Sequence, residues 1–267
     1  MNTNLVPFLK WAGGKRWLTV NYANLFPEKF NNYIEPFVGG GAVYFNKNPK
    51  QAIISDMNTD LINTYKAIQE DWGKVEKLLI KYHTKHNRDF YYYMRSKKTK
   101  SIFTSAAKFI YLNRTCWNGL YRVNKKGEFN VPIGTKTNVI LNSDNFQEIS
   151  NRLKNTKILN LDFEQTIAMA KEDDFLFVDP PYTVKHDNNG FVKYNEVLFE
   201  WSDQERLHHI LLEAKLRGVK IMLTNAHHQS IRELYEKDFH ITTVERHSVI
   251  AGNANARGKS KEYLIQG

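Results

Sequence analysis

The 267-residue sequence predicts an α/β fold: a doubly wound, Rossmann-like sheet interrupted by an inserted, mainly helical domain. Three observations support this prediction. Short apolar runs typical of β-strands alternate with helical patterns, as in other α/β proteins. Several of these runs end in an acidic residue. The second and third runs are also separated by about 100 residues, which is far more than a single crossover connection needs.

Seven runs are predicted to be strands. In chain order they are residues 31–41, 51–56, 156–163, 174–182, 219–225, 239–247 and 262–267. The first run leads into a triple-glycine turn. The last two are expected to form a closing pair at the edge of the sheet.

Two helical patterns fit between these strands. One follows the second strand at 59–69, and a better-marked helix lies between the fourth and fifth strands. In the second helix, Ser202 and Glu205 form a capping-box signature, and apolar residues then recur at helical spacing. Gly218 is expected to end this helix, because glycine readily adopts the left-handed conformation found after a last turn.

The strand spacing predicts two domains. Residues 1–62 plus 150–267 would form the doubly wound domain, and residues 63–149 would form the inserted domain. A mobile loop is expected at 252–261.

The positive charge is concentrated in one segment. The chain has a net charge of +10, but residues 73–136 alone contain 15 Lys and Arg against 3 Asp and Glu. The remaining chain contains 23 basic and 25 acidic residues, and is close to neutral. A solvated surface is the simplest interpretation of such a segment. The concentration of positive charge in one segment, beside a nearly neutral remainder, favours a polyanion as binding partner. Nucleic acid is favoured over a membrane.

Composition excludes several classes of protein. No apolar run approaches the roughly 20 residues of a membrane span, and the N-terminus lacks the layout of a signal peptide. The single cysteine, Cys116, excludes an internal disulfide framework and a cysteine-rich zinc site. The neighbouring histidine pairs cannot ligate as i, i+4 pairs do, so no metal site is predicted. We therefore expect a cytoplasmic protein without a metal.

The glycine turn after the first strand and the acid after the second suggest a nucleoside site. Gly39, Gly40 and Gly41 permit close approach of the backbone to a ligand, and Asp56 could accept both ribose hydroxyls. An Asx turn before the next helix is an alternative role for Asp56. The run is neither G-x-G-x-x-G nor a P-loop, so a pyrophosphate ligand is disfavoured.

A nucleoside cofactor without phosphates points to S-adenosylmethionine. Asp162 and Phe163 end the third strand. Asp162 would accept from the adenine amino group, and Phe163 would cover the adenine face.

The segment D-P-P-Y ends the fourth strand at Asp179, Pro180, Pro181 and Tyr182. An exocyclic amino group on a base is a weak nucleophile, because its lone pair is delocalised into the ring. The Asp179 carboxylate and the Pro180 carbonyl could accept its two hydrogens, held in place by two rigid prolines. Tyr182 could stack on the base. An ordinary proline turn after a strand is the alternative.

A target atom inside a duplex is unreachable, so the base would have to be flipped out. Methylation at cytosine C5 is disfavoured, because it needs a cysteine nucleophile. Cys116 lies in the predicted insert and is better explained as a packing residue.

Seven segments carry a resemblance to a known family. They are F-L-K-W-A-G-G-K (8–15), Y-I-E-P-F-V-G-G-G-A (33–42), S-D-M-N-T-D-L-I (55–62), N-R-T-C-W-N-G-L-Y-R-V-N (113–124), G-E-F-N-V-P-I-G (127–134), D-F-E (162–164) and D-P-P-Y (179–182). In this order they resemble the motifs of the Dam-type (D12 class) DNA adenine-N6 methyltransferases, over nearly the whole chain. The doubly wound part would then be the S-adenosylmethionine-dependent catalytic domain, and 63–149 the DNA target-recognition domain.

The resemblance implies a set of cofactor residues. These are Trp11, Ala12, Gly13, Gly14, Lys15, Glu35, Pro36, Phe37, Gly39, Gly40, Gly41, Asp56, Asp162 and Phe163. Residues Asp179 to Tyr182 would be catalytic. The alternative for Lys15 is that it is a basic residue on the surface without a role in cofactor binding.

The resemblance also implies DNA-binding residues in the insert and beside it. Trp117 would enter the duplex with Asn118 beside the vacated position, and Arg122 would read a guanine. Lys10 would make a further base contact, and Arg114 would support the loop. Leu120, Asn124 and Pro132 would line the base-reading surface. The alternatives are a core position for Trp117 and phosphate contacts alone for Arg122.

The recognition loop most resembles that of family members acting on GATC, so we expect N6-methylation of that adenine in double-stranded DNA. Single-stranded DNA is a further candidate substrate, because an unstacked base needs no flipping. A monomer or weak dimer is expected. The alternatives are methylation of cytosine N4 or of adenine in RNA, and a catalytically silent DNA-binding relative. A nicotinamide enzyme is disfavoured by the glycine pattern.

Overall fold

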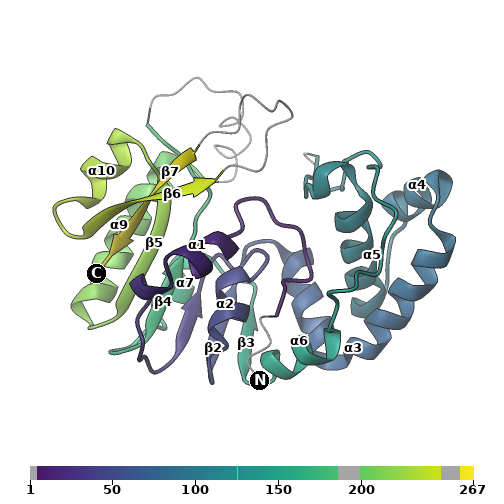
Figure 1. Ribbon diagram of the computed structural model, residues 1–267, viewed down its shortest axis with the longest axis horizontal. Helices are drawn as coiled ribbons and strands as arrows, with labels where there is room; N and C mark the ends of the chain where they lie inside the picture. Colours follow the sequence, from purple (N-terminus) through teal and green to yellow (C-terminus); the bar gives the residue numbers. More distant parts are fainter. Residues whose placement is uncertain (1–4, 125, 186–198, 248–258) are drawn as a thin grey trace. The chain divides into compact units, whose positions relative to one another are not determined.

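The computed structural model of the protein describes residues 5–124, 126–185, 199–247 and 259–267. It has a mixed α/β fold, and the strand order across its sheet is β3-β2-β1-β4-β5-β7-β6 (Figure 1). The chain proceeds outward from β1 in one direction and resumes at β4 in the other, which is the pattern of a doubly wound sheet. The predicted α/β class with a doubly wound sheet is therefore confirmed, whereas the predicted helical insert stays a prediction.

All seven predicted strands are present. They are β1 (Tyr33–Glu35), β2 (Ala52–Ser55), β3 (Thr156–Leu159), β4 (Phe175–Val178), β5 (Lys220–Ala226), β6 (His240–His247) and β7 (Lys259–Gln266). Strand β1 pairs in parallel with β2 and β4, and β4 pairs in parallel with β5. The closing pair is antiparallel, with β7 between β5 and β6.

The helices of the described chain are α1 (Arg16–Asn21), α2 (Ala42–Lys47), α3 (Thr59–Lys85), α4 (Arg88–Ser96), α5 (Ile102–Thr115), α6 (Phe146–Leu153), α7 (Phe163–Ile167), α9 (Trp201–Leu216) and α10 (Gln229–Tyr235). Two short 3₁₀ turns, η1 (Ala23–Leu25) and η2 (Trp117–Gly119), complete the set. No helix in these described residues is long and apolar enough to cross a membrane.

The described chain forms two compact units, each built from separate segments. Unit 1 comprises Met1–Val20, Val38–Lys50 and Asp56–Asn160, and unit 2 comprises Asn21–Phe37, Gln51–Ser55 and Leu161–Gly267. The predicted division into 1–62 plus 150–267 and 63–149 groups the residues differently and stays a prediction.

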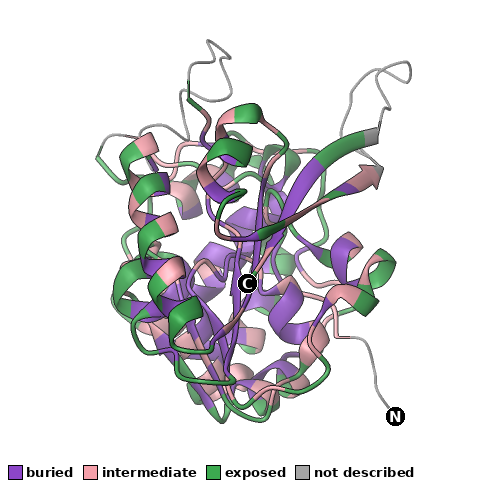
Figure 2. Ribbon diagram, turned by 90° about the vertical axis from the view of Figure 1, so that its left-hand side faces the viewer, coloured by how far each residue is buried: buried purple, intermediate pink, exposed green. Residues whose placement is uncertain are grey.

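The core of unit 2 explains why its strands are nearly continuous apolar runs. All four residues of β4 are buried, because a parallel strand covered by helices meets apolar side chains on both faces. Figure 2 shows the strands in the middle of the molecule largely in the colour of buried residues. Leu176 and Val178 pack in one cluster with Leu207 and Leu211 of α9 and Ile231 of α10.

The start of α9 differs from the prediction. The helix begins at Trp201, and the Asp203 carboxylate accepts the Glu200 backbone N–H at 2.9 Å. The capping box is therefore Glu200 and Asp203, and the predicted pair Ser202 and Glu205 is wrong, because the chain already turns helical one residue before Ser202. Gly218 ends the helix as predicted, with φ at +82°.

The C-terminal loop prediction is partly wrong. Residues 252–258 lie outside the described residues, but 259–261 belong to β7. The pairing of Glu245 with Lys261 and of Arg246 with Ser260 extends the β-ladder into this stretch. Cross-strand pairing thus overrides a composition that favours a loop.

Helix α3 is longer than the predicted 59–69 segment and dominates unit 1. The Asn58 side chain caps its first turn by accepting the Leu61 N–H at 3.0 Å. The helix continues through a kink at Asp71, where φ is −155° and ψ is 85°. It packs along α5, whose own start is a capping box of Ser101 and Thr104.

A buried arginine joins distant segments of unit 1. Arg114, in the last turn of α5, is 1% exposed. Its guanidinium donates to the Phe8 carbonyl, to the Val139 carbonyl at 2.7 Å, and to both oxygens of Asp144 at 2.6 and 2.7 Å. The bidentate geometry satisfies the buried charge, which would otherwise be strongly destabilising.

Replacement of Asp144 by alanine should destabilise the protein strongly, because it leaves the Arg114 guanidinium buried without its counter-charge. Removal of one partner of a buried pair typically costs about 3–5 kcal/mol. Urea unfolding followed by circular dichroism would measure the loss. Glu236→Ala, which breaks the exposed Arg232–Glu236 pair, is the control and should leave the midpoint almost unchanged. Equal effects of the two variants would contradict the role given to Arg114.

Candidate active site

The carboxyl ends of β1 and β4 are neighbours in unit 2, because the strands pair in parallel with Tyr33 opposite Phe175. Strand β1 leads into Pro36 and Phe37, and β4 leads into 179–182. In open α/β sheets, ligands bind beyond the carboxyl ends at the point where the strand order reverses. The D-P-P-Y segment follows one of the two strands at this point.

The carboxylate of Asp179 is held from the neighbouring strand. Its Oδ1 atom accepts a 2.7 Å hydrogen bond from the hydroxyl of Thr224, a fully buried residue on β5. Asp179 is half-buried, and Pro180 behind it is buried. Thr224 was not among the predicted site residues, although a hydroxyl residue near the end of the apolar run V-K-I-M-L-T-N was a usable signal.

The phenol of Tyr182 is anchored by an acid. Its hydroxyl donates to the Glu262 Oε2 atom at 2.7 Å. Partial burial raises the pKa of Tyr182 well above its ordinary value, and the negative charges of Asp179 and Glu262 raise that pKa further. The phenol therefore stays protonated near neutral pH and serves as a hydrogen-bond donor. Glu262 was also absent from the predicted site residues.

Asp162 is engaged by two structural contacts. It is the N-cap of α7, where Oδ1 accepts the Glu164 N–H at 2.9 Å. Arg206 of α9 binds both of its carboxylate oxygens, at 2.9 and 3.1 Å. Arg206 was not predicted. These bonds leave the carboxylate little capacity to accept further hydrogen bonds. Contact of Asp162 with a cofactor adenine stays a prediction.

Phe163 is mostly covered by its neighbours. Its ring stacks on Phe37 with centroids 5.5 Å apart, and the Arg206 guanidinium lies 4.2 Å above it. Phe163 is 3% exposed, whereas Phe37 is half-buried. Of the two predicted cofactor residues, Phe37 is the more accessible ring.

Glu35 and Pro36 are buried at the end of β1. The Glu35 Oε2 atom accepts the Tyr33 hydroxyl at 2.9 Å. The Pro36 carbonyl accepts a long 3.4 Å bond from the Ser55 hydroxyl of β2. The backbone leading into the glycine turn is therefore tied to the neighbouring strand.

In unit 1, Asp56 holds the glycine turn. Its Oδ2 atom accepts the Gly39 N–H at 3.1 Å, and its Oδ1 atom accepts the Asn58 N–H at 2.9 Å. Burial raises the pKa of Asp56, and the two backbone bonds lower it. The Asx-turn alternative is thus present, but the same carboxylate also fixes Gly39, whose φ is +46°. A carboxylate has about four acceptor positions, so ribose hydroxyls remain compatible with both bonds.

Lys15 is not a superficial base. It is 3% exposed, and its Nζ atom donates to the Gly13 carbonyl at 2.8 Å. Ala12, Gly13 and Gly14 are exposed in the preceding turn. The surface alternative for Lys15 is therefore wrong.

Trp11 connects the glycine turn with the predicted recognition segment, all within unit 1. A Cβ atom on Gly39 would lie 2.7 Å from the Trp11 ring, so the backbone passes directly against the indole. The Trp11 ring also stacks with Tyr121 and Phe109, with ring centroids 5.9 and 6.4 Å apart. Tyr121 was not among the predicted site residues.

The turn at 117–120 presents large side chains to solvent. Trp117 is 52% exposed and Leu120 is 40% exposed. Asn118 and Gly119 between them both have left-handed φ angles, 55° and 68°. The Trp117 N–H donates to the carbonyl of the exposed Pro132 at 2.9 Å, which fixes the turn. The core alternative for Trp117 is wrong.

Lys10 is fixed beside this turn by a buried asparagine. The Asn113 side chain accepts the Lys10 N–H at 2.9 Å and donates to the Lys10 carbonyl at 2.8 Å. It also donates to the Gly119 carbonyl at 3.2 Å. Lys10 is exposed, so one buried amide positions an exposed cation and the 117–120 turn together.

A short hairpin carries Arg122. Val123 bridges Phe129, and the Arg122 Nε atom donates to Asn130 at 2.8 Å. The Asn124 side chain accepts the Glu128 N–H and so organises the turn. Arg122 is exposed, whereas Arg114 is buried, so its predicted role as a support of the loop is the one that burial allows.

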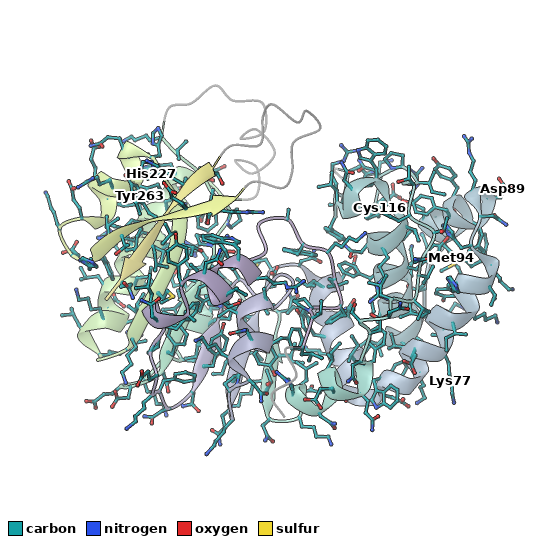
Figure 3. The ribbon with its side chains drawn as sticks, in the orientation of Figure 1. Lys77, Asp89, Met94, Cys116, His227 and Tyr263 are labelled. Carbon is teal, nitrogen blue, oxygen red and sulfur yellow. The ribbon has the colours of Figure 1, made fainter. Side chains whose placement is uncertain are left out.

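The remaining reactive side chains have packing roles. Cys116, at the end of α5 (Figure 3), is 2% exposed, and burial raises the pKa of its thiol to about 11. His227 packs on the Tyr263 ring in a tilted arrangement with centroids 4.5 Å apart (Figure 3), and the His208 Nε2 atom lies 3.0 Å from the Asp238 Oδ2 atom. In the part of the chain that is described, no cluster of three or more His, Cys, Asp or Glu could hold a metal.

Comparison with known proteins identifies the family. Residues 11–250 match the family model described as D12 class N6 adenine-specific DNA methyltransferase. Type II methyltransferase M1.LlaDCHI of Lactococcus lactis is 36% identical, over 98% of this chain and 95% of that protein. M.MjaIII, a type II methyltransferase of Methanocaldococcus jannaschii, is 38% identical over 86% and 88%. The DNA adenine methylase of Haemophilus influenzae is 34% identical over 97% and 92%.

The chain therefore belongs to the D12 class of N6 adenine-specific DNA methyltransferases. The family resemblance seen in the sequence motifs is confirmed.

Replacement of Gly39 by alanine should destabilise the protein more than the same change at Gly127. Both glycines have a left-handed φ, which costs an L-residue roughly 1–2 kcal/mol. Only at Gly39 would the new Cβ also collide with Trp11, since no atom lies within 4 Å at Gly127. Thermal unfolding of the two variants side by side would show the difference, and equal losses would contradict the close packing of Trp11 on the turn.

Proposed function

We propose that the protein transfers a methyl group from S-adenosylmethionine to N6 of the adenine in GATC, after that base has flipped out of the duplex. The observation that carries this proposal is the D-P-P-Y segment at the reversal point of the sheet. Thr224 fixes its acid at 2.7 Å and Glu262 fixes its aromatic ring at 2.7 Å. Family membership supports the target atom, because the class is N6 adenine-specific.

The acceptors at this segment suit the nucleophile. The Asp179 carboxylate and the Pro180 carbonyl would accept the two hydrogens of the adenine amino group, which concentrates its lone pair on nitrogen. When bound, S-adenosylmethionine supplies an electrophilic methyl group. The adenine nitrogen would take the methyl carbon as the carbon–sulfur bond breaks, the bonding electrons would leave with the sulfur as a neutral thioether, and the extra proton of the amino group would pass to solvent. Tyr182, kept as a protonated phenol, would stack on the base and would not act as the general base.

Each unit, taken by itself, offers groups that suit the cofactor. In unit 1, Asp56 would hold the ribose from beside the left-handed turn at Gly39, and Lys15 would hold its loop from within. In unit 2, Phe37 offers an accessible ring. A nucleoside that carries a sulfonium needs carboxylate, backbone and aromatic groups to bind it, and it does not need a phosphate-binding loop.

The exposed groups of the recognition segment suit DNA. Arg122 would read a guanine by the usual bidentate contact, Trp117 would enter the duplex, and Lys10 would reach the same site. The concentration of Lys and Arg in 73–136 supports phosphate contacts along the duplex. Arg114 would act from the interior by fixing the backbone.

Asp179→Ala should reduce kcat on the order of 10²–10³-fold, the loss typical of removing one preorganised hydrogen-bonding group from a transition state. Binding of S-adenosylmethionine, measured by calorimetry, should remain. Glu172→Ala, at the opposite end of β4 and exposed, is the matched control and should keep full turnover. Substantial turnover in Asp179→Ala would refute the catalytic role of this carboxylate.

Treatment with the enzyme should protect GATC sites from a nuclease that cuts only the unmodified sequence. Two duplexes that differ only in an intact or scrambled GATC would be incubated with methyl-labelled S-adenosylmethionine, and the product nucleosides would be separated. Label in N6-methyladenine on the first duplex alone is expected, because Arg122 and its neighbours select the site. Label on both duplexes would overturn the specificity, and label in N4-methylcytosine would overturn the target atom.

A further inference from the structure

Tyr182 is restrained at both ends. Its backbone follows two prolines, which fix φ and limit the conformations of this segment. Its hydroxyl donates to Glu262 at 2.7 Å, the short distance of a charge-assisted bond to a carboxylate. Rotation of the ring about its first side-chain bond would break this contact. The orientation of the aromatic face therefore depends on the contact with Glu262, beside a second side-chain contact of the hydroxyl with Thr224.

Glu262 is itself held in place by its surroundings. The residue is 7% exposed and lies on β7 between two strands, opposite Ala226 of β5 and Val244 of β6. The Arg246 Nη1 atom lies 3.8 Å from its second oxygen, Oε1. A buried carboxylate needs such partners to remain charged. The anchor therefore belongs to the rigid antiparallel part of the sheet.

The two strands β5 and β7 divide the support of the D-P-P-Y segment between them. Thr224 of β5 binds Asp179, and Glu262 of β7 binds Tyr182. Thr224 pairs with Leu264 in the β5–β7 register, two residues from Glu262. The acceptor for the amino group and the ring for the base are thus held by adjacent strands of one ladder.

We propose that Glu262 is a positioning residue for methyl transfer, which holds the Tyr182 ring in the orientation needed to stack on the flipped adenine. This inference rests on the proposed function. Glu262 would not touch the base, and its effect would pass entirely through the Tyr182 hydroxyl. Misplacement of a reacting group by about 1 Å can reduce rate by 10²-fold, so a loosened ring should be visible in turnover.

A double-mutant cycle with Tyr182→Phe tests the inference. Glu262→Ala and Tyr182→Phe each remove the same hydrogen bond, and each should reduce kcat on the GATC duplex roughly 10-fold or more. The double variant should be no slower than the slower single variant, because both changes remove one interaction. Glu262→Gln keeps an acceptor oxygen and should restore most of the turnover. The KM for S-adenosylmethionine should stay within about twofold in all of them, since an interaction realised only at the transition state affects kcat.

The wild-type protein and Lys261→Ala are the controls. Lys261 is the exposed neighbour of Glu262 on β7, and its replacement should leave kcat unchanged. A wild-type protein that transfers no label to DNA would overturn the proposed function. An active wild type with unchanged kcat in Glu262→Ala, or with losses that add fully in the double variant, would overturn the positioning role alone. If Glu262→Ala does not fold, Tyr182→Phe decides: reduced kcat supports the role, and unchanged kcat contradicts it.

Discussion

The parallel pairing of β1 with β4 is the constraint on which the candidate site of unit 2 depends. Tyr33 and Ile34 lie opposite Phe175 and Leu176, and all four are fully buried. Burial of this apolar pair aligns the ends of two strands that are far apart in the sequence. Polar residues placed just beyond those ends cannot join the core, so they remain at the reversal point of the sheet, where ligands bind.

A second layer of contacts gives the site its rigidity. Asp179, Tyr182 and Asp162 each bind a side chain from elsewhere in unit 2, which is Thr224, Glu262 and Arg206 in turn. Buried polar groups of this kind are costly unless each finds its hydrogen-bond partner. When they do, the groups proposed to face a substrate are fixed before it arrives, which would reduce the reorganisation needed for reaction.

The same logic operates in unit 1 at the end of α5. Asn113 and Arg114 are adjacent in the sequence, and both are buried. Asn113 binds the backbone of Lys10 and of the 117–120 turn, whereas Arg114 binds segments in the interior of unit 1. Between them they present Trp117 and Leu120 to solvent on a fixed backbone. Large exposed apolar side chains on a rigid support are typical of a surface that meets a partner.

The sequence by itself determined the doubly wound α/β class, the D-P-P-Y segment after β4, the glycine turn with Asp56, and the family. Each of these features is a short local run of residues, and its chemistry can be recognised without knowledge of its tertiary contacts. Only the tertiary structure decided what holds them. Thr224, Glu262 and Arg206 lie 44 to 80 residues from the groups they bind, and no local pattern predicts such pairs. The cap of α9 and the start of β7 were missed for a related reason, since one hydrogen bond and one strand pairing overrode the local composition. Burial decided two of the alternatives: it placed Lys15 inside and left Trp117 outside, a choice that depends on packing rather than on residue type.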